Sequence, residues 1–331
     1  MKLVLGLAAA TLMAAPAVAQ DWQPDKPINI IVPWSAGGST DQVTRVVAPL
    51  LEEALGQTVV VVNQPGASGS IGTKAALDAP RDGYTWTANA IANNATYSVT
   101  GLVPDTSIDD YRVYLHIANV PVVSVNPDSD IKTFEDFLAK MKSGDLNVAT
   151  AGINSSGGMA LAALKEASGE TGGRMIAYDG GNPAVLAAAS GEAQATTQLA
   201  SEQAELIRAG RLRPLVALSS SPLEIEGIDA IPPITNYLEM DVAPDYFGVF
   251  IPTGAPQEVY DTVDKIWQDK VMNAQALKDY AKNRGATFQP AYGDDAKAMA
   301  MPVVISEACA KVSRKEAVID PSEIGITCPA E

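Results

Sequence analysis

The sequence predicts an α/β protein with two lobes. Short apolar runs alternate with segments of helical spacing along almost the whole chain, which is typical of an α/β fold with a largely parallel sheet. The 331 residues are enough for about two domains. At least four apolar runs end in loops rich in glycine and hydroxyl side chains that lead directly into helices. Because ligands of open α/β sheets bind at such loops, we expect a ligand cleft between the lobes.

The N-terminal residues predict an export signal. Lys2 supplies the charge, residues 3–13 form an apolar core, and Ala17–Ala19 match the small-residue cleavage pattern. We expect cleavage after Ala19, so that residues 1–19 are removed and the mature protein is exported. The alternative is a membrane anchor, but this apolar core is too short to span a bilayer of about 30 Å. The residue directly after the cleavage site is Gln20 and not a cysteine, which argues against a lipoprotein.

The first part of the chain contains two strand–loop–helix units. An apolar strand over 28–32 precedes a glycine-rich loop and a helix over 40–55, which Gly56 terminates. Pro49 lies inside this helix and should kink it. The elements expected next are a strand over 58–62, a helix over 70–78, a strand over 85–90, a polar segment over 89–97, a strand region near 112–125 and a helix capped by Thr133.

The middle of the chain repeats this pattern, and the end is helical. A proline-rich connection over 228–245 separates the two parts. The expected strands are 146–150, 174–178, 193–198, 213–218 and 246–251, and the expected helices are 159–167, one starting at Pro183, one ending at Gly210, 256–284 and 294–312. We assign residues 20–121 and 247–331 to lobe 1 and residues 122–246 to lobe 2.

The glycine-rich loops indicate an anion site without cationic side chains. A helix N-terminus offers unpaired N–H groups and about half a positive charge, and glycine lets a ligand approach that backbone closely. Ser39, Thr40, Ser68 and Ser70 can add hydroxyl donors. Several such loops together would hold a carboxylate. The loops that lack lysine and arginine are 33–41, 66–72, 150–158, 179–183 and 198–201.

Other chemistries find little support. The phosphate-binding pattern GxxxxGK[ST], the dinucleotide pattern GxGxxG after a strand and the GxSxG nucleophile motif are all absent. The single histidine, His116, excludes multi-histidine metal sites, and we expect no metal and no cofactor. An exported hydrolase using Ser39 or Ser68 is a weak alternative, because His116 lies on another segment and no other base is evident. A net charge of −16 argues against nucleic acid as a partner.

The two cysteines, Cys309 and Cys328, are predicted to pair. Disulfides are common in exported proteins, and these residues are the only cysteines of the chain. Their bond would close a loop of about 20 residues and contribute roughly 3 kcal/mol in the chain-entropy model.

Several motifs together resemble one family. The stretch KPINIIVPWSAGGSTDQVTRVVAPLLEEALGQTVVVVNQPGASGSIG, followed by APRDGYTW, is similar to the substrate-binding proteins of tripartite tricarboxylate transporters, the TctC or Bug family. The similarity continues through AYDGGNPAVLAAASGE, IRAGRLRPLVALS and FGVFIPTGAP, and so covers nearly the whole mature chain. Each piece alone is weak, but the combination is highly specific.

The resemblance implies a type II periplasmic-binding-protein fold whose cleft closes on a carboxylated solute. It implies a monomeric periplasmic receptor, not an enzyme, that delivers its ligand to the integral-membrane subunits of the transporter; a receptor for a sensor kinase is the alternative. Backbone amides of two lobe 1 loops would clamp one ligand carboxylate. The ligand-binding positions it implies are Ser35, Ala36, Gly38, Ser39 and Asp41; Ala67, Ser68, Gly69 and Ser70; Thr150, Ala151, Ser155 and Ser156; and Tyr178, Asp179 and Gly180.

Three departures from the family pattern bear on the ligand. Trp34 and Ala36 replace a phenylalanine and a proline, and Gln194 and Gln198 stand where other members carry aspartates. Asp179 stands where many members carry lysine. Because this exchange adds negative charge, we expect a mono- or dicarboxylate, or a solute that also bears an amine, in preference to a tricarboxylate.

Overall fold

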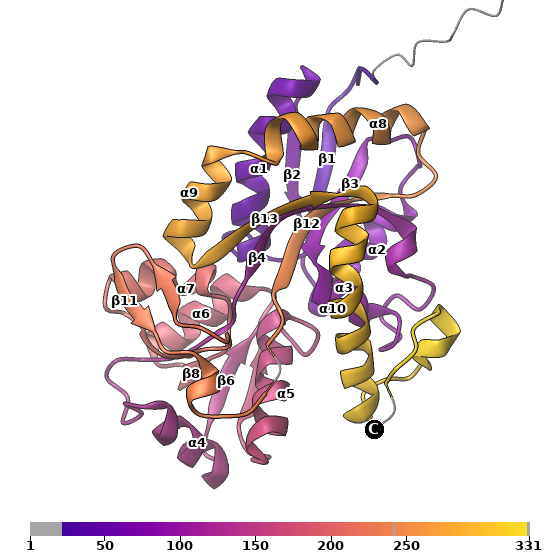
Figure 1. Cartoon of the computed structure of the whole chain (residues 1–331). Helices are drawn as coiled ribbons and strands as arrows, with labels where there is room; N and C mark the ends of the chain where they lie inside the picture. Colours follow the sequence, from indigo (N-terminus) through magenta and orange to yellow (C-terminus); the bar gives the residue numbers. More distant parts are fainter. Residues whose placement is uncertain (1–21, 241, 330–331) are drawn as a thin grey trace, which may run out of the picture.

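Two mixed β-sheets, each covered by helices, form the two lobes of the protein (Figure 1). The computed structural model describes residues 22–240 and 242–329, so the expected export signal and its cleavage site lie outside the described residues. The larger sheet has the strand order β13-β4-β12-β3-β1-β2, and the smaller one has the order β7-β6-β8-β5-β9.

The strands of the larger sheet come from both ends of the described chain, whereas those of the smaller sheet come from its middle. The six-stranded sheet contains β1 (Ile28–Val32), β2 (Val59–Asn63), β3 (Thr85–Ala90), β4 (Tyr111–Asn119), β12 (Asp245–Pro252) and β13 (Ala286–Tyr292). The five-stranded sheet contains β5 (Val122–Val125), β6 (Asn147–Thr150), β7 (Arg174–Ala177), β8 (Ala195–Thr196) and β9 (Arg213–Ala217). A separate hairpin is formed by β10 (Leu223–Ile225) and β11 (Ile228–Ile231).

The α-helices divide in the same way. Those that accompany the larger sheet are α1 (Ser39–Leu55), α2 (Ser70–Asp78), α3 (Ile91–Tyr97), α8 (Gln257–Ile266), α9 (Gln275–Arg284) and α10 (Gly293–Ser313). Those that accompany the smaller sheet are α4 (Phe134–Ser143), α5 (Ser156–Ser168), α6 (Gly181–Ser190) and α7 (Ala200–Arg208). No helix within residues 22–240 and 242–329 is long and apolar enough to cross a membrane.

The prediction of a largely parallel sheet is wrong, because both sheets are mixed. β1 pairs in parallel with β2 and β3, and β6 with β7 and β8. By contrast, β12 runs antiparallel to β3 and β4, β13 to β4, and β5 to β8 and β9. The physical reason lies in the crossings between lobes. β4 carries the chain towards the smaller sheet and β12 brings it back, so that Asp245 at the start of β12 pairs with Asn119 at the end of β4.

Alternating side chains of β4 join the hydrophobic clusters on the two faces of the larger sheet. Tyr114 packs in a cluster with α1, α8 and α9, whereas Val113 and Leu115 pack in another with α3 and α10. This is the period of two that a strand imposes. Each cluster is buried between helices and sheet, which holds the strand ends, and the loops that follow them, in fixed positions.

Helix α3, the hairpin β10–β11 and strand β13 are not predicted by the sequence. The polar segment over 89–97 forms helix α3, whose Asn93 and Thr96 are buried and therefore give no amphipathic pattern. The hairpin β10–β11 occupies part of the proline-rich connection, and β13 lies between the last two helical stretches. β13 contains Pro290 and is an edge strand with an irregular register, as expected where proline removes a ladder donor.

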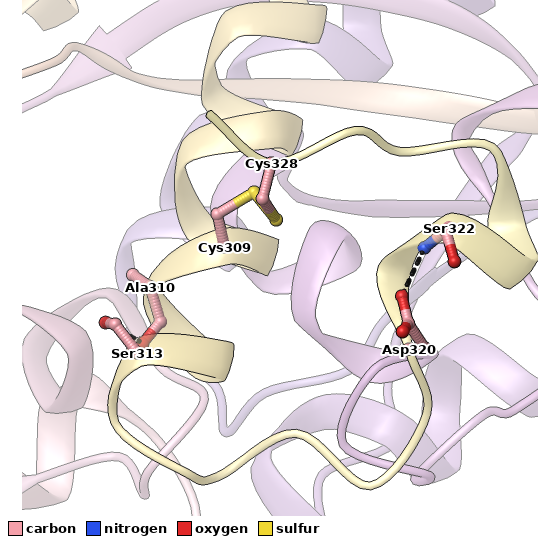
Figure 2. The surroundings of a disulfide bond; sticks show 6 residues. All are labelled: Cys309, Ala310, Ser313, Asp320, Ser322 and Cys328. Carbon is pink, nitrogen blue, oxygen red and sulfur yellow. Dashed lines mark hydrogen bonds between the residues drawn. A yellow bond between two sulfur atoms is a disulfide. The ribbon is translucent and has the colours of Figure 1, made fainter. Parts of the chain in front are cut away.

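The C-terminal tail is fastened to α10 by a disulfide, as predicted. Figure 2 shows Cys309 of α10 bonded to Cys328, with a Cα–Cα distance of 5.5 Å. In the intervening turn, the backbone N–H of Ser322 donates to the Asp320 carboxylate at 2.9 Å. The prediction for Thr133 is also confirmed, since its side chain caps α4 and Asp136 completes a capping box.

Candidate functional site

The N-terminal ends of helices from both lobes meet in a narrow cleft. A cavity of about 20 Å³ lies between them, which is room for about one water molecule. Its lining combines hydroxyl, amide and aromatic side chains with one carboxylate, and within the described chain it includes no lysine, arginine or histidine. The lining residues are Trp34, Ser39, Thr40, Asn93, Ala151, Ser155, Ser156, Gly181, Gln198, Leu199, Glu202 and Phe247.

The carboxylate in this lining, Glu202, connects the two lobes. Its Oε1 accepts from the backbone N–H of Ser39, the first residue of α1, at 2.9 Å, and its Oε2 accepts from the N–H of Leu199 at 3.3 Å. Burial raises the pKa of Glu202 to about 7, and the two backbone donors act in the opposite direction. One of the amides that the sequence assigned to a ligand therefore binds a side chain of the protein itself.

Close packing at the start of α6 requires glycine at two consecutive positions. A Cβ added at Gly181, the first residue of α6, would lie 1.9 Å from Glu202 Oε1. A Cβ added at Gly180 would lie 2.0 Å from Ser35 Oγ, across the cleft. The backbone N–H of Ser35 also donates to the Asp179 carbonyl at 3.2 Å. The lobes are thus in direct backbone contact in this structure.

A second buried acid, Asp245, lies where the chain returns to lobe 1. Its Oδ2 accepts from the Ser156 hydroxyl at 2.5 Å, and its Oδ1 accepts from the Ala92 N–H at 3.4 Å. Burial raises the pKa of Asp245 to about 7, and the nearby Glu307 carboxylate raises it further. Asp245 therefore links α5 of one lobe to α3 of the other.

The loop that precedes α2 is held in a strained conformation. Ala67 and Ser68 have φ values of 46° and 53°, in the left-handed region that residues other than glycine rarely occupy. Tyr97 Oη donates to the Ser68 carbonyl at 2.9 Å. Across the cleft, a Cβ added at Gly152 would lie 2.3 Å from Ser68 Oγ. Packing from both lobes therefore holds this loop in place.

Of the sixteen positions implied by the resemblance, four line the cavity: Ser39, Ala151, Ser155 and Ser156. Gly38, Thr150 and Gly180 are the chain neighbours of the lining residues Ser39, Ala151 and Gly181. Ser35 and Ala36 do not line the cavity but contact the other lobe, through Asp179 and Asn182. The Asp41 carboxylate instead accepts from the backbone N–H of Gly37 and the side-chain amide of Asn63 and pairs with Arg45. It therefore shapes the first loop. Asp179 is exposed, and the Tyr178 hydroxyl donates to Glu192. Ala67, Ser68, Gly69 and Ser70 do not line the cavity.

Several lining residues were not assigned to the site from the sequence. Asn93 could have been found, since it lies in the polar segment that follows β3; its Nδ2 donates to the Asn154 carbonyl at 2.8 Å. Gln198 was noted only as a departure from the family pattern. Its side chain is buried, and its Nε2 has no hydrogen-bond partner within the described residues. The local bond of Glu202 to the Leu199 N–H only caps α7, and its contact across the cleft is with Ser39, which is distant in the sequence.

The geometry also bears on the hydrolase alternative. His116 lies in β4 and is buried, and within the described chain neither ring nitrogen has a hydrogen-bond partner. Burial lowers the pKa of His116 to about 3. Ser39 Oγ instead receives hydrogen bonds from Asn119 and Ser201, both at 2.8 Å. His116 is therefore not placed as a base for either serine.

Known proteins of similar sequence and structure are consistent with this architecture. The family described as "Tripartite tricarboxylate transporter family receptor" matches residues 43–320. The protein BugT of Bordetella pertussis is 32% identical over 294 residues, which are 86% of this chain and 88% of BugT. The structure of the periplasmic binding protein BugD has a TM-score of 0.79 at 23% identity and covers 89% of this chain and 99% of its own. An R. palustris protein with adipate also has a TM-score of 0.79, at 22% identity, over 90% and 99% of the two chains.

Proposed function

Because this chain belongs to the family of tripartite tricarboxylate transporter receptors, we propose that its cleft binds a small organic carboxylate for delivery to the integral-membrane subunits of such a transporter. Proteins of this family are periplasmic and bind substrates rather than transform them, so the chain is a solute-binding protein and not an enzyme. It has the type II periplasmic-binding-protein fold. In our proposal the export signal is cleaved after Ala19, and the mature chain acts as a monomer.

The cleft carries this proposal because backbone and hydroxyl donors from both lobes surround it. The helices α1, α5, α6 and α7 all begin at or beside the cavity, and Ser39, Ser155 and Ser156 line it. A helix start offers N–H groups and a partial positive charge, worth about 0.3–1 kcal/mol to an anion and up to about 2 kcal/mol when partly buried. The ligand in our proposal is bound by the loops that carry these helix starts, with Ser39, Ala151, Ser155 and Ser156 nearest to it and without a lysine or arginine.

We further propose that the ligand is a mono- or dicarboxylate rather than a tricarboxylate. The similar R. palustris protein is described with adipate, a dicarboxylate. In this chain Glu202 lines the cleft and Asp245 is bonded to the lining residue Ser156, so each further ligand carboxylate would increase the repulsion.

Binding in this proposal involves a motion of two lobes, residues 20–121 with 247–331 and residues 122–246. The division of strands between the two sheets supports these boundaries. Since the cavity holds about one water molecule, a solute enters only when the lobes move apart. Opening separates Ser39 from Glu202 and Ser35 from Asp179.

Thermal unfolding of the mature protein with a panel of mono-, di- and tricarboxylates and neutral solutes tests the proposal. A ligand at 100 times its dissociation constant should stabilise the protein by about 2.7 kcal/mol. We expect stabilisation by one class of mono- or dicarboxylate. Stabilisation by neutral solutes alone would contradict carboxylate binding, and stronger binding of citrate than of any smaller carboxylate would contradict the preferred class.

A further inference from the structure

Two side chains near the start of α7 present opposite hydrogen-bonding groups to the cleft. Gln198 and Glu202 both line the cavity. Gln198 is only 2% exposed, and its Nε2 donor has no partner within the described residues. A buried donor of this kind requires an acceptor. Glu202, in contrast, presents two carboxyl oxygens.

The acceptors of Glu202 are only partly used. A carboxylate has about four acceptor positions, and one hydrogen bond reaches each oxygen, from Ser39 and Leu199. The bond to Ser39 crosses the cleft, so opening of the lobes to admit a solute breaks it. The carboxylate then faces the solute from a lining that, within the described chain, contains no lysine or arginine.

We propose that the solute carries a positively charged nitrogen as well as its carboxylate, with the nitrogen bound by Glu202 and the carboxylate by the amide of Gln198. This inference rests on the proposed function, since it names the class of carboxylate that the same cleft accepts. A second carboxylate beside Glu202 would place two like charges in a poorly solvated site, whereas a cationic nitrogen replaces the donor that Glu202 loses on opening. Asp245, which is bonded to the lining residue Ser156, adds to the preference for a cation.

Isothermal titration calorimetry with two matched series of solutes tests this proposal. One series is unbranched amino acids with the amine and the carboxylate at opposite ends, separated by one to five methylenes. The other series is dicarboxylates with the same numbers of methylenes. We expect the best amino acid to bind the wild-type protein about tenfold or more tightly than the dicarboxylate of equal length. The reverse order would overturn the inference while leaving the proposed function intact.

Variants then assign the roles. Glu202→Gln should lower the affinity for the amino acids about tenfold or more and reduce or reverse the preference over dicarboxylates. Gln198→Leu should weaken both series alike, since both share the first carboxylate. Glu205→Gln is the matched control, because Glu205 lies on the same helix and pairs with Arg208 and Arg284 outside the cavity; it should change neither series.

The outcomes separate the two proposals. An unchanged preference in a folded Glu202→Gln protein would overturn the role of Glu202, and should that variant not fold, the preference of the wild-type protein between the two series decides the question. If no member of either series and no tricarboxylate binds, the proposed function fails as well. Binding of dicarboxylates alone refutes only the inference.

Discussion

Replacing Asp245 with asparagine should change how the stability of the protein depends on pH. The pKa of this buried carboxyl is raised to about 7 from an ordinary value of 3.8, so the folded state holds a proton that the unfolded state releases. Between about pH 4 and pH 7 the free energy of unfolding therefore falls as pH rises, by about 1.4 kcal/mol per pH unit. The stabilisation is complete below about pH 4 and is lost above about pH 7.

The asparagine side chain does not titrate, and its oxygen can still accept from the Ser156 hydroxyl. Any cost of the substitution in packing or hydrogen bonding is therefore similar at every pH, and only the titration differs. We subtract the free energy of unfolding of the wild type from that of Asp245→Asn. We expect this difference to be about 3 kcal/mol higher at pH 8 than at pH 5. Relative to wild type, the variant is therefore more stable at neutral and alkaline pH than in acid.

Urea-induced unfolding of both proteins at several pH values between 5 and 8 measures this difference. Asp229→Asn provides the matched control, because Asp229 is exposed on β11 and its substitution should give no comparable trend. Parallel curves for wild type and Asp245→Asn would refute the reasoning, since they would show that Asp245 has the same proton affinity in the folded and unfolded states.

Three further predictions concern other parts of the fold. The lowered pKa of His116 changes stability in the opposite direction to that of Asp245. Below about pH 6.5 the unfolded state gains a proton while the folded state does not, which lowers the free energy of unfolding by about 2 kcal/mol at pH 5. His116→Leu should remove this acid sensitivity in the same urea measurements, and an unchanged slope would contradict it. Gly38→Val should block ligand binding in calorimetry, because its side chain crowds the start of α1, whereas Arg45→Ala should leave binding largely intact; equal losses would indicate a cationic contribution. Joint replacement of Cys309 and Cys328 by serine should lower the unfolding free energy by about 3 kcal/mol, and an unchanged denaturation midpoint would show that the tail adds no stability.

Elements whose pattern is local can be predicted from the sequence, whereas elements that depend on long-range packing cannot. The predicted helix over 70–78 and strand over 85–90 have the observed bounds of α2 and β3, since their patterns are carried by the residues themselves. Helix α3 is not predicted because its buried asparagine and threonine side chains resemble the composition of a loop; Asn93 is satisfied by a long-range hydrogen bond to Asn154 and Thr96 by one within the helix. β13 was missed because an edge strand interrupted by Pro290 has little alternation.

The sequence by itself determined the family, the disulfide, and the glycine- and hydroxyl-rich loops at which helices begin. These features follow from short segments whose conformation depends on neighbouring residues: turns, caps and periodic apolar positions. Only the tertiary structure decided what faces those loops. Glu202 meets Ser39, and Asp245 meets Ser156 and Ala92, because folding brings together residues that are far apart along the chain. Burial then raises the pKa of each carboxyl, a property that no local pattern encodes, since it depends on how much water the surrounding elements exclude.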